Sequence, residues 1–151
     1  MYNWPMSKIL ALMAMVLGLL SASLNVNHTV DGVKSIQVGN TILTNIEIAN
    51  TPAKKEQGLS GRTEIGENYG MLFVFDKADT YAFWMKEMLV PIDIIWLNEN
   101  FKVVGLKSRA LPGSYPETYK PEQAAKYVLE VKAGIIEKEA LKVGQELVIS
   151  R

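Results

Sequence analysis

Residues 34–49 read KSIQVGNTILTNIEIA, and along residues 42–48 the stretch follows a period of two. Successive side chains of a strand point to opposite faces, so this period is typical of a half-buried β-strand. Gly39-Asn40 interrupts the stretch and suits a two-residue turn, because glycine readily adopts a positive φ. The chain is therefore predicted to open its folded part with a β-hairpin.

A short helix is predicted directly after this hairpin. Thr51 has the side chain of a helix N-cap and Pro52 suits the first helical position. The helix is expected to run to Gln57, because Gly58 and Gly61 are typical of a helix end.

Strand-like runs dominate the remainder. Four of them are separated by short turn sequences and predict a meander: 71–75, 81–86, 92–97 and 101–106. A proline-rich surface loop (108–123), a strand (127–131), a short helix (134–141) and a closing strand (146–149) are expected to follow. Together these patterns predict a mainly β (α+β) fold, a compact antiparallel barrel-like or sandwich-like single domain with two short helices.

Composition excludes several classes of function. The 151 residues contain no cysteine and one histidine, His28, and 16 basic side chains balance 16 acidic ones. Thiol catalysis, cysteine-ligated zinc and a histidine triad within the fold are thereby excluded, and no metal or cofactor is expected. Nucleic acid is not an expected partner, since no basic cluster is visible.

The N-terminal sequence predicts targeting. Lys8 precedes the apolar run 9–20, and Ser21-Ala22-Ser23 suits signal-peptidase cleavage; Met6 is an alternative start. We expect residues 1–23 to be a signal peptide or an N-terminal membrane segment, 24–34 a linker and 35–151 the β-rich domain. The protein is expected to be exported, periplasmic or extracellular, with residues 9–20 as its only contact with a membrane if they are retained as an anchor.

Asp93 is the first candidate site residue. It lies between Ile92 and Ile94 in a predicted strand, and a buried carboxylate needs a partner. If runs 81–86 and 92–97 pair as antiparallel neighbours, one register sets Lys86 opposite Asp93, and a register shifted by two sets Trp84 there instead. A purely structural ion pair, or a carboxylate that satisfies a turn, is the alternative.

Three further residues complete the predicted ligand-binding set. Arg62 follows the predicted helix, where its guanidinium could clamp Asp93 or a ligand anion, or cover the carboxyl end of the helix. Trp84 could line a pocket or simply pack at the edge of the core. Tyr115 belongs to the proline-rich loop, and convergence of that loop with Arg62, Trp84 and Asp93 would create a ligand pocket.

Several segments resemble, in order and spacing, the domain of unknown function 192 family: IEIANTPAKKEQGLSGR, GMLFVF, FWMKEMLVPIDIIWL, YVLEVKAG and LKVGQEL. The most specific pieces are the turn at 58–62 and the pair of motifs at 83–86 and 91–94. The family typically has Met where this chain has Ser60, and Asn-Thr where it has Glu87-Met88. The resemblance covers about residues 35–149 and implies a compact β-rich fold that is often exported, without an established activity.

Three functional hypotheses follow. The first is an exported, non-catalytic binding or accessory module of the cell envelope, recognising a small anionic or saccharide-like ligand or an envelope protein. The second is a hydrolase that uses Asp93 with Lys86 or Arg62; a Ser60–Lys86 dyad has no supporting motif, and for glycoside chemistry Glu130 and Glu146 are the candidate second carboxylates. The third is a structural envelope protein without a ligand site.

Overall fold

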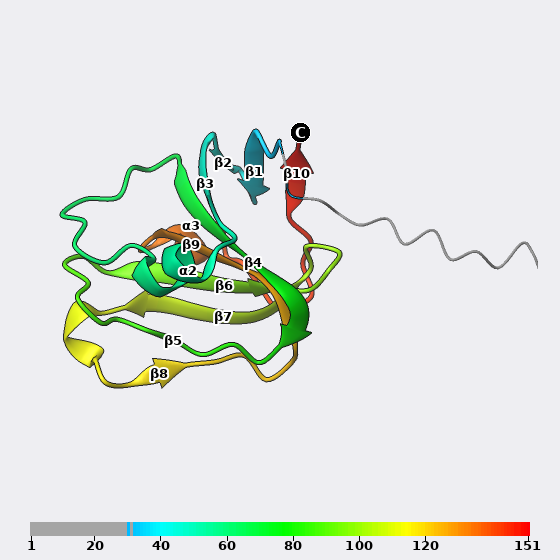
Figure 1. Ribbon diagram of the computed structural model, residues 1–151. Helices are drawn as coiled ribbons and strands as arrows, with labels where there is room; N and C mark the ends of the chain where they lie inside the picture. The colour runs from blue at the N-terminus through cyan, green and yellow to red at the C-terminus, as the bar shows by residue number, and fades with distance from the viewer. Residues whose placement is uncertain (1–29, 31) are drawn as a thin grey trace, which may run out of the picture.

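The computed structural model describes residue 30 and residues 32–151 (Figure 1). The predicted signal or anchor segment (1–23), His28 and most of the predicted linker lie outside the described residues. The elements are β1 (Ser35–Val38), β2 (Thr41–Leu43), β3 (Asn45–Ala49), α2 (Pro52–Gln57), β4 (Tyr69–Asp79), β5 (Phe83–Trp84), β6 (Ile92–Leu97), β7 (Val103–Ala110), the 3-10 helix η1 (Pro112–Ser114), β8 (Thr118–Tyr119), β9 (Ala125–Lys132), α3 (Ile135–Lys138) and β10 (Val148–Ser150).

Three open sheets make up the described domain. A five-stranded sheet has the order β3-β4-β9-β6-β7, a three-stranded sheet the order β10-β1-β2, and β5 pairs with β8. The prediction of a mainly β single domain with two short α-helices is confirmed, although no sheet in the described region closes into a barrel. One pair departs from the antiparallel pattern, because β3 and β4 run parallel.

The predicted opening hairpin is present and ends earlier than expected. Ile36 pairs with Leu43 across β1 and β2. The chain then bends at Thr44. The backbone N–H groups of Thr44 and Asn45 both donate to the carbonyl of Asn68, at 2.9 and 3.0 Å, and hold this bend in place. The residues after this bend form β3 and join the five-stranded sheet. The continuous alternation seen in the sequence is therefore divided between strands of two different sheets.

The predicted meander is wrong. Strand β9 lies between β4 and β6, and of the four predicted meander strands only β6 and β7 pair with each other in this sheet. The central place of β9 agrees with its nearly continuous burial on both faces. Of the run 81–86 only two residues form a strand, which pairs with β8 outside the large sheet (Figure 1).

Each face of the five-stranded sheet has its own core. Leu72, Ile95 and Leu129 pack on the face covered by β1, β2 and α3. Phe73 and Val128 belong to the second core, beneath α2 and the β5–β8 pair. None of the helices described for residues 30 and 32–151 is both long and apolar enough to cross a bilayer.

Candidate functional site

Asp93 has a structural role and lines neither of the two cavities described below. Its side chain is 0% exposed, and its carboxylate accepts hydrogen bonds from three backbone N–H groups, those of Arg109 (2.8 Å), Gly134 (3.0 Å) and Ile136 (2.8 Å). The predicted register with Lys86 is wrong, because Asp93 lies opposite Val131 in β9. The carboxylate therefore ties β7 and the start of α3 to β6, as the alternative of a turn-satisfying carboxylate expected.

Arg62 pairs with a different carboxylate from the one expected. Its guanidinium donates to Oε2 of Glu47 at 2.6 Å, and the hydroxyl of Tyr69 donates to the same oxygen at 2.7 Å. Partial burial would raise the pKa of Glu47, but the bonds from Arg62 and Tyr69 outweigh burial and lower it. Arg62 thus belongs to a partly exposed cluster that clamps the loop after α2 to β3 and β4.

The other predicted site residues are spread over the surface. Trp84 is 51% and Tyr115 50% exposed. Tyr115 lines neither cavity described below, whereas Trp84 lines both and Lys86 lines one. Ser60 donates its hydroxyl to the backbone carbonyl of Lys86 at 2.9 Å, a bond that positions the loop. The predicted convergence of Arg62, Trp84, Asp93 and Tyr115 does not occur.

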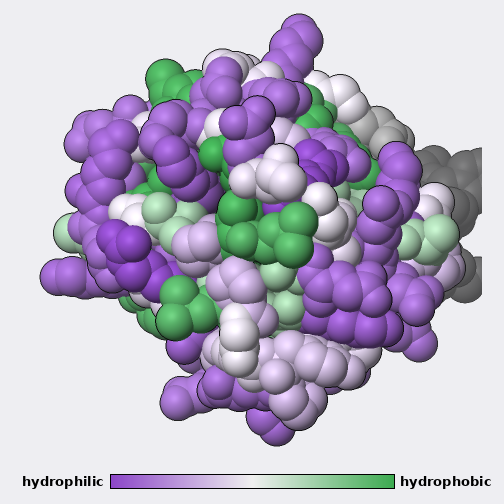
Figure 2. All heavy atoms as spheres, turned by 90° about the vertical axis from the view of Figure 1, so that its left-hand side faces the viewer, coloured by the Kyte–Doolittle hydropathy of each residue, from purple (hydrophilic) through white to green (hydrophobic). Residues whose placement is uncertain are grey.

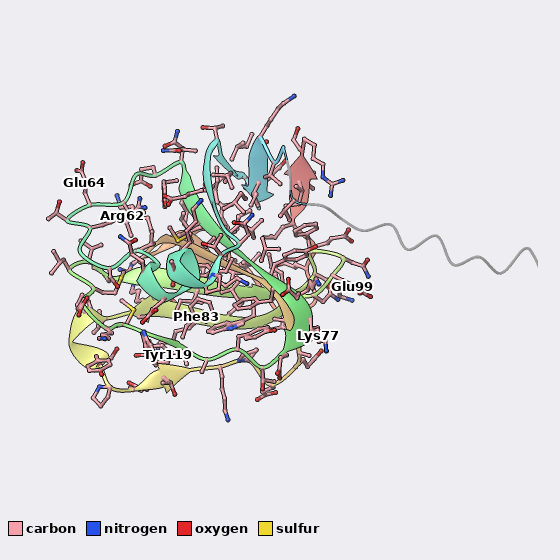
Figure 3. The ribbon with its side chains drawn as sticks, viewed as in Figure 1. Arg62, Glu64, Lys77, Phe83, Glu99 and Tyr119 are labelled. Carbon is pink, nitrogen blue, oxygen red and sulfur yellow. The ribbon has the colours of Figure 1, made fainter. Side chains whose placement is uncertain are left out.

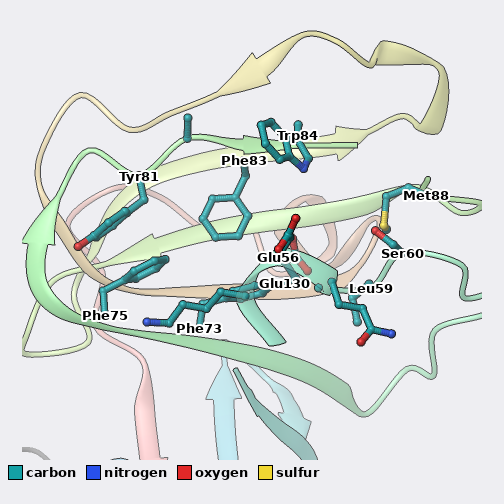
Figure 4. Close-up of a pocket in the computed structure, with 14 residues that line it drawn as sticks. Glu56, Leu59, Ser60, Phe73, Phe75, Tyr81, Phe83, Trp84, Met88 and Glu130 are labelled. Carbon is teal, nitrogen blue, oxygen red and sulfur yellow. The ribbon is translucent and has the colours of Figure 1, made fainter. Parts of the chain in front are cut away.

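The first candidate site is an aromatic pocket of about 150 Å³ between α2 and residues 81–84 (Figure 4). Its aromatic lining comes from β4, the residues around β5 and β5 itself: Phe73, Phe75, Tyr81, Phe83 and Trp84. Figure 3 shows Phe83 on the inner side of β5, where its ring packs edge-on against Phe73 with centroids 4.9 Å apart. The indole N–H of Trp96 donates to the carbonyl of Tyr81 at 3.0 Å and holds this segment over the sheet.

Glu130 lies at the buried end of this pocket. It belongs to β9, faces the second core between Met71 and Ile94, and is 5% exposed. Its Oε2 is buried and has no hydrogen-bond partner. Burial raises the pKa of Glu130 to about 8, against an opposing effect of the Arg62 charge. At neutral pH the group is therefore mostly a neutral carboxylic acid.

Gly58 shapes the pocket beside Glu130. This residue ends α2 with φ 49° and ψ −131°, a conformation that L-residues rarely adopt. A β-carbon at this position would lie 3.5 Å from Cζ of Phe73 and 3.7 Å from Oε2 of Glu130. The glycine allows the chain to turn close to the carboxyl group.

A second hollow of about 330 Å³ adjoins the pocket. It shares Glu56, Gln57, Ser60 and Trp84 with the pocket and adds Ala53, Lys86 and Glu87. The loops that follow α2 and β5 lie toward the end of the molecule viewed in Figure 2, where hydrophilic side chains surround a small group of apolar ones. The predicted residues Trp84 and Lys86 are thus at the edge of the site rather than its centre.

Sequence reasoning gave Glu130 only a minor place. The available signal was a single carboxylate within the apolar run YVLEV, the same kind of signal that singled out Asp93. The sequence could not show which of the two lacks partners. Among the described residues, no group of three or more acidic or histidine side chains is arranged to hold a metal ion.

The pocket can bind a polar group but lacks a formed catalytic pair. A neutral carboxylic acid both donates and accepts hydrogen bonds, and aromatic walls bury the apolar part of a ligand. Glu56 from α2 places a second, exposed carboxylate in the lining. A ligand in this pocket would meet one buried polar group, the carboxyl group of Glu130.

Comparisons with known proteins give a family and a fold. A family model described as DUF192, Uncharacterized ACR, matches residues 34–149. A UPF0127 protein of Thermococcus sibiricus is 32% identical over 107 residues, which are 68% of this chain and 64% of that protein, so the match spans less than two thirds of the relative.

Two crystal structures share the fold. A protein of unknown function from Novosphingobium aromaticivorans has a TM-score of 0.70 and 28% identity, covering 80% of this chain and 89% of that one. A protein of Sinorhizobium meliloti, described as a candidate transcription regulator, has a TM-score of 0.67 and 29% identity, covering 72% of this chain and 82% of its own.

Proposed function

We propose, from the premise that the chain belongs to the DUF192 family of uncharacterised proteins, that this protein is a binding module that takes a small ligand into the pocket between α2 and β5. The ligand contributes a polar group that bonds to the carboxyl group of Glu130 and an apolar part that packs on Phe73 and Phe83. In this proposal the protein acts as an accessory protein by binding the ligand, without catalysing a reaction.

The observation that carries this proposal is the partnerless oxygen of Glu130. A buried polar atom without a hydrogen bond costs about 1–3 kcal/mol of folding free energy. Such a cost is common at functional sites, where the partner arrives with the ligand. Gly58 turns the chain beside the same carboxyl group in a conformation that other residues would adopt only with strain.

The geometry gives no support to a hydrolase built on Asp93. Both oxygens of that carboxylate accept backbone hydrogen bonds, and its side chain is fully buried. Lys86 and Arg62, the two predicted cationic partners, contact other groups or the surface. A substrate therefore has no access to the predicted nucleophile or base.

A nuclear magnetic resonance titration tests the binding proposal. Isotopically labelled Leu24–Arg151 is titrated with small amines, alcohols, sugars and carboxylic acids, one class at a time. We expect at least one class to shift amide signals of residues that line the pocket, and Glu130→Gln to weaken that binding at least tenfold. Absence of binding by all four classes, or binding that Glu130→Gln leaves unchanged, would overturn the proposal and favour a structural protein without a ligand site.

The module is further proposed to act outside the cytoplasm, in the periplasm or extracellular space. Support comes from the sequence: Lys8, the apolar run 9–20 and the small residues 21–23 fit an export signal. Fractionation of cells that express the full chain tests this step. Recovery of a chain that begins at Leu24 in the envelope or medium is expected, and accumulation of the uncleaved chain in the cytosol would contradict it.

A further inference from the structure

We infer that the ligand of the aromatic pocket is a small organic ammonium ion, which displaces the ammonium group of Lys55 from the ring of Phe75 and lies against Glu130. The inference deepens the proposed function and rests on it. It names the chemical class of the ligand, and it identifies the ammonium group of Lys55 as a group of the protein that competes with the ligand for the same position.

One ring of the pocket, that of Phe83, lies at right angles to two others. Phe83 is inclined at 86° to Phe73 and at 86° to Phe75, with centroid separations of 4.9 and 6.5 Å. Perpendicular rings turn faces and edges toward a shared space, and the negative face of an aromatic ring attracts a cation. Sets of such rings are how proteins recognise organic ammonium groups.

Lys55 already places a cation in this aromatic setting. Its Nζ lies 4.6 Å from the centroid of Phe75. Tyr81 stacks on Phe75 at 3.6 Å with an interplanar angle of 12°, so the ammonium takes the opposite face. Lys55 is a partly exposed residue of α2, and a cation–π contact near the protein surface is weak. A ligand cation can therefore replace the ammonium group of Lys55 at the ring of Phe75.

Two carboxyl groups complete the site for a cation. The partnerless Oε2 of Glu130 can accept a hydrogen bond from an ammonium N–H, and a charge-assisted bond of this kind is stronger than a neutral one. Glu56 contributes an exposed carboxylate to the same lining, as Figure 4 shows. An anionic ligand would instead be repelled by the carboxylate of Glu56 and would gain no charge attraction from the neutral, buried Glu130.

The charges that face Glu130 come from several elements. Arg62, in the loop after α2, favours ionisation of Glu130, but its guanidinium is engaged by Glu47 of β3. Tyr69 of β4 also lies within electrostatic reach of Glu130. The β6 residue paired with Glu130 is the apolar Ile94.

Lys55 and Glu56 are the charged residues that α2 adds to the lining. They carry opposite charges, so α2 leaves little net charge near Glu130. The carboxyl group therefore keeps its pKa of about 8 in the free protein. A ligand cation beside Oε2 lowers this pKa, and the bound complex holds Glu130 ionised.

Binding of a cation is therefore expected to release a proton, and the affinity is expected to rise with pH. Below pH 8 the free protein carries the proton of Glu130 and the complex does not, so binding releases it and affinity rises with pH by up to about tenfold per unit. At pH 7 we expect the release of about 0.9 proton per bound ligand. A neutral ligand that bonds to the protonated carboxyl group would release none.

Isothermal titration calorimetry with a matched pair of probes tests the inference. n-Butylammonium and 1-butanol have similar size and differ in charge. With Leu24–Arg151 at pH 7 we expect the ammonium ion to bind at least tenfold more tightly than the alcohol. Titrations in phosphate and in MOPS, whose ionisation enthalpies differ and neither of which carries a net positive charge, give the number of protons released.

Three variants locate the effect. Glu130→Gln should abolish proton release and weaken butylammonium binding at least tenfold. Lys55→Met removes the competing cation and should strengthen butylammonium binding several-fold, whereas an anionic ligand would be weakened by it. Lys142→Met removes a surface cation that lines neither cavity and should leave the affinity unchanged.

The outcomes that would overturn the inference differ from those that would overturn the proposed function. Equal affinity for butanol, absence of proton release, or weaker binding in Lys55→Met would each exclude the ammonium class. Binding of a sugar, alcohol or carboxylic acid at the same residues would then leave the proposed function standing. If none of the four ligand classes binds in the nuclear magnetic resonance titration, both the inference and the proposed function are overturned.

Discussion

Two buried carboxyl groups on the neighbouring strands β6 and β9 have opposite surroundings. Asp93, on β6, accepts three backbone N–H groups, whereas Oε2 of Glu130, on β9, has no partner. They face opposite cores of the same sheet. One group therefore holds backbone segments together through its hydrogen bonds, and the other is favoured in its protonated form by burial.

Glu130 should make the stability of the protein fall as pH rises. Its pKa is about 8 in the folded state against 4.5 for an ordinary glutamate. Between these values the folded chain holds a proton that the unfolded chain has lost, so the free energy of unfolding decreases by up to about 1.4 kcal/mol per pH unit. Glu130→Gln should lose this slope and exceed the wild type in stability at pH 8. Urea unfolding at pH 5.5, 6.5, 7.5 and 8.0 measures both slopes and the difference at pH 8, and parallel curves for the two proteins would contradict the expectation.

Asp93→Asn should destabilise the domain by about 2–4 kcal/mol. The amide replaces one acceptor oxygen with an N–H₂ group, which then faces backbone donors that have no other partner. Lys86→Met should recover none of this loss, because Lys86 is exposed and does not contact Asp93. Denaturant unfolding of both single variants and the double variant provides the test. Recovery of stability in the double variant would restore the ion pair predicted from the sequence.

At the scale of elements, local signals were read correctly and distant pairings were not. The hairpin of β1 and β2 and the start of α2 depend on neighbouring residues, and both lie where the sequence predicts. The insertion of β9 between β4 and β6 joins segments far apart in the chain, and alternation carries no information about the partner of a strand.

The candidate site was predicted only at its edge for the same reason. Its lining comes from α2, β4, β5 and β9, which no spacing in the sequence brings together. Trp84 and Lys86 belong to one local motif; Trp84 lines the pocket at its exposed edge, and Lys86 lines only the adjoining hollow. Asp93 and Glu130 were indistinguishable as lone acids in apolar strands until their hydrogen-bond partners were known.

Gly58→Ala should test the end of α2, where the helix meets the pocket. The methyl group has room, at 3.5 Å from Phe73, but φ 49° with ψ −131° is strained for alanine. We expect a loss of about 1–3 kcal/mol. Gly113→Ala is the matched control, because nothing lies within 4 Å of its added carbon and its φ is not positive. Equal stability of the two variants in urea unfolding would show that the backbone at residue 58 is free of strain.

At the scale of the whole molecule, the large sheet is covered unequally. The strands β10, β1 and β2 with α3 close one face over a continuous apolar core. The other face is covered by the short helix α2 and the two-residue strands β5 and β8, and the pocket opens between them. Short elements leave a gap above a sheet that long ones would fill, which is where a buried acid can meet a ligand.

The described domain should fold without residues 1–23. Its first buried residue is Val30, which packs in the core beneath β1, and the backbone N–H of Val33 donates to its carbonyl at 3.3 Å. Leu24–Arg151 keeps these contacts, so we expect a cooperatively unfolding β-rich protein. In that chain Val30→Ala should cost about 1.5 kcal/mol, since it removes two buried methyl equivalents, whereas the exposed Val143→Ala should change stability by less than about 0.5 kcal/mol. Circular dichroism during urea unfolding compares the three proteins. An unfolded Leu24–Arg151, or equal stability of the two valine variants, would mean that the core does not begin at Val30.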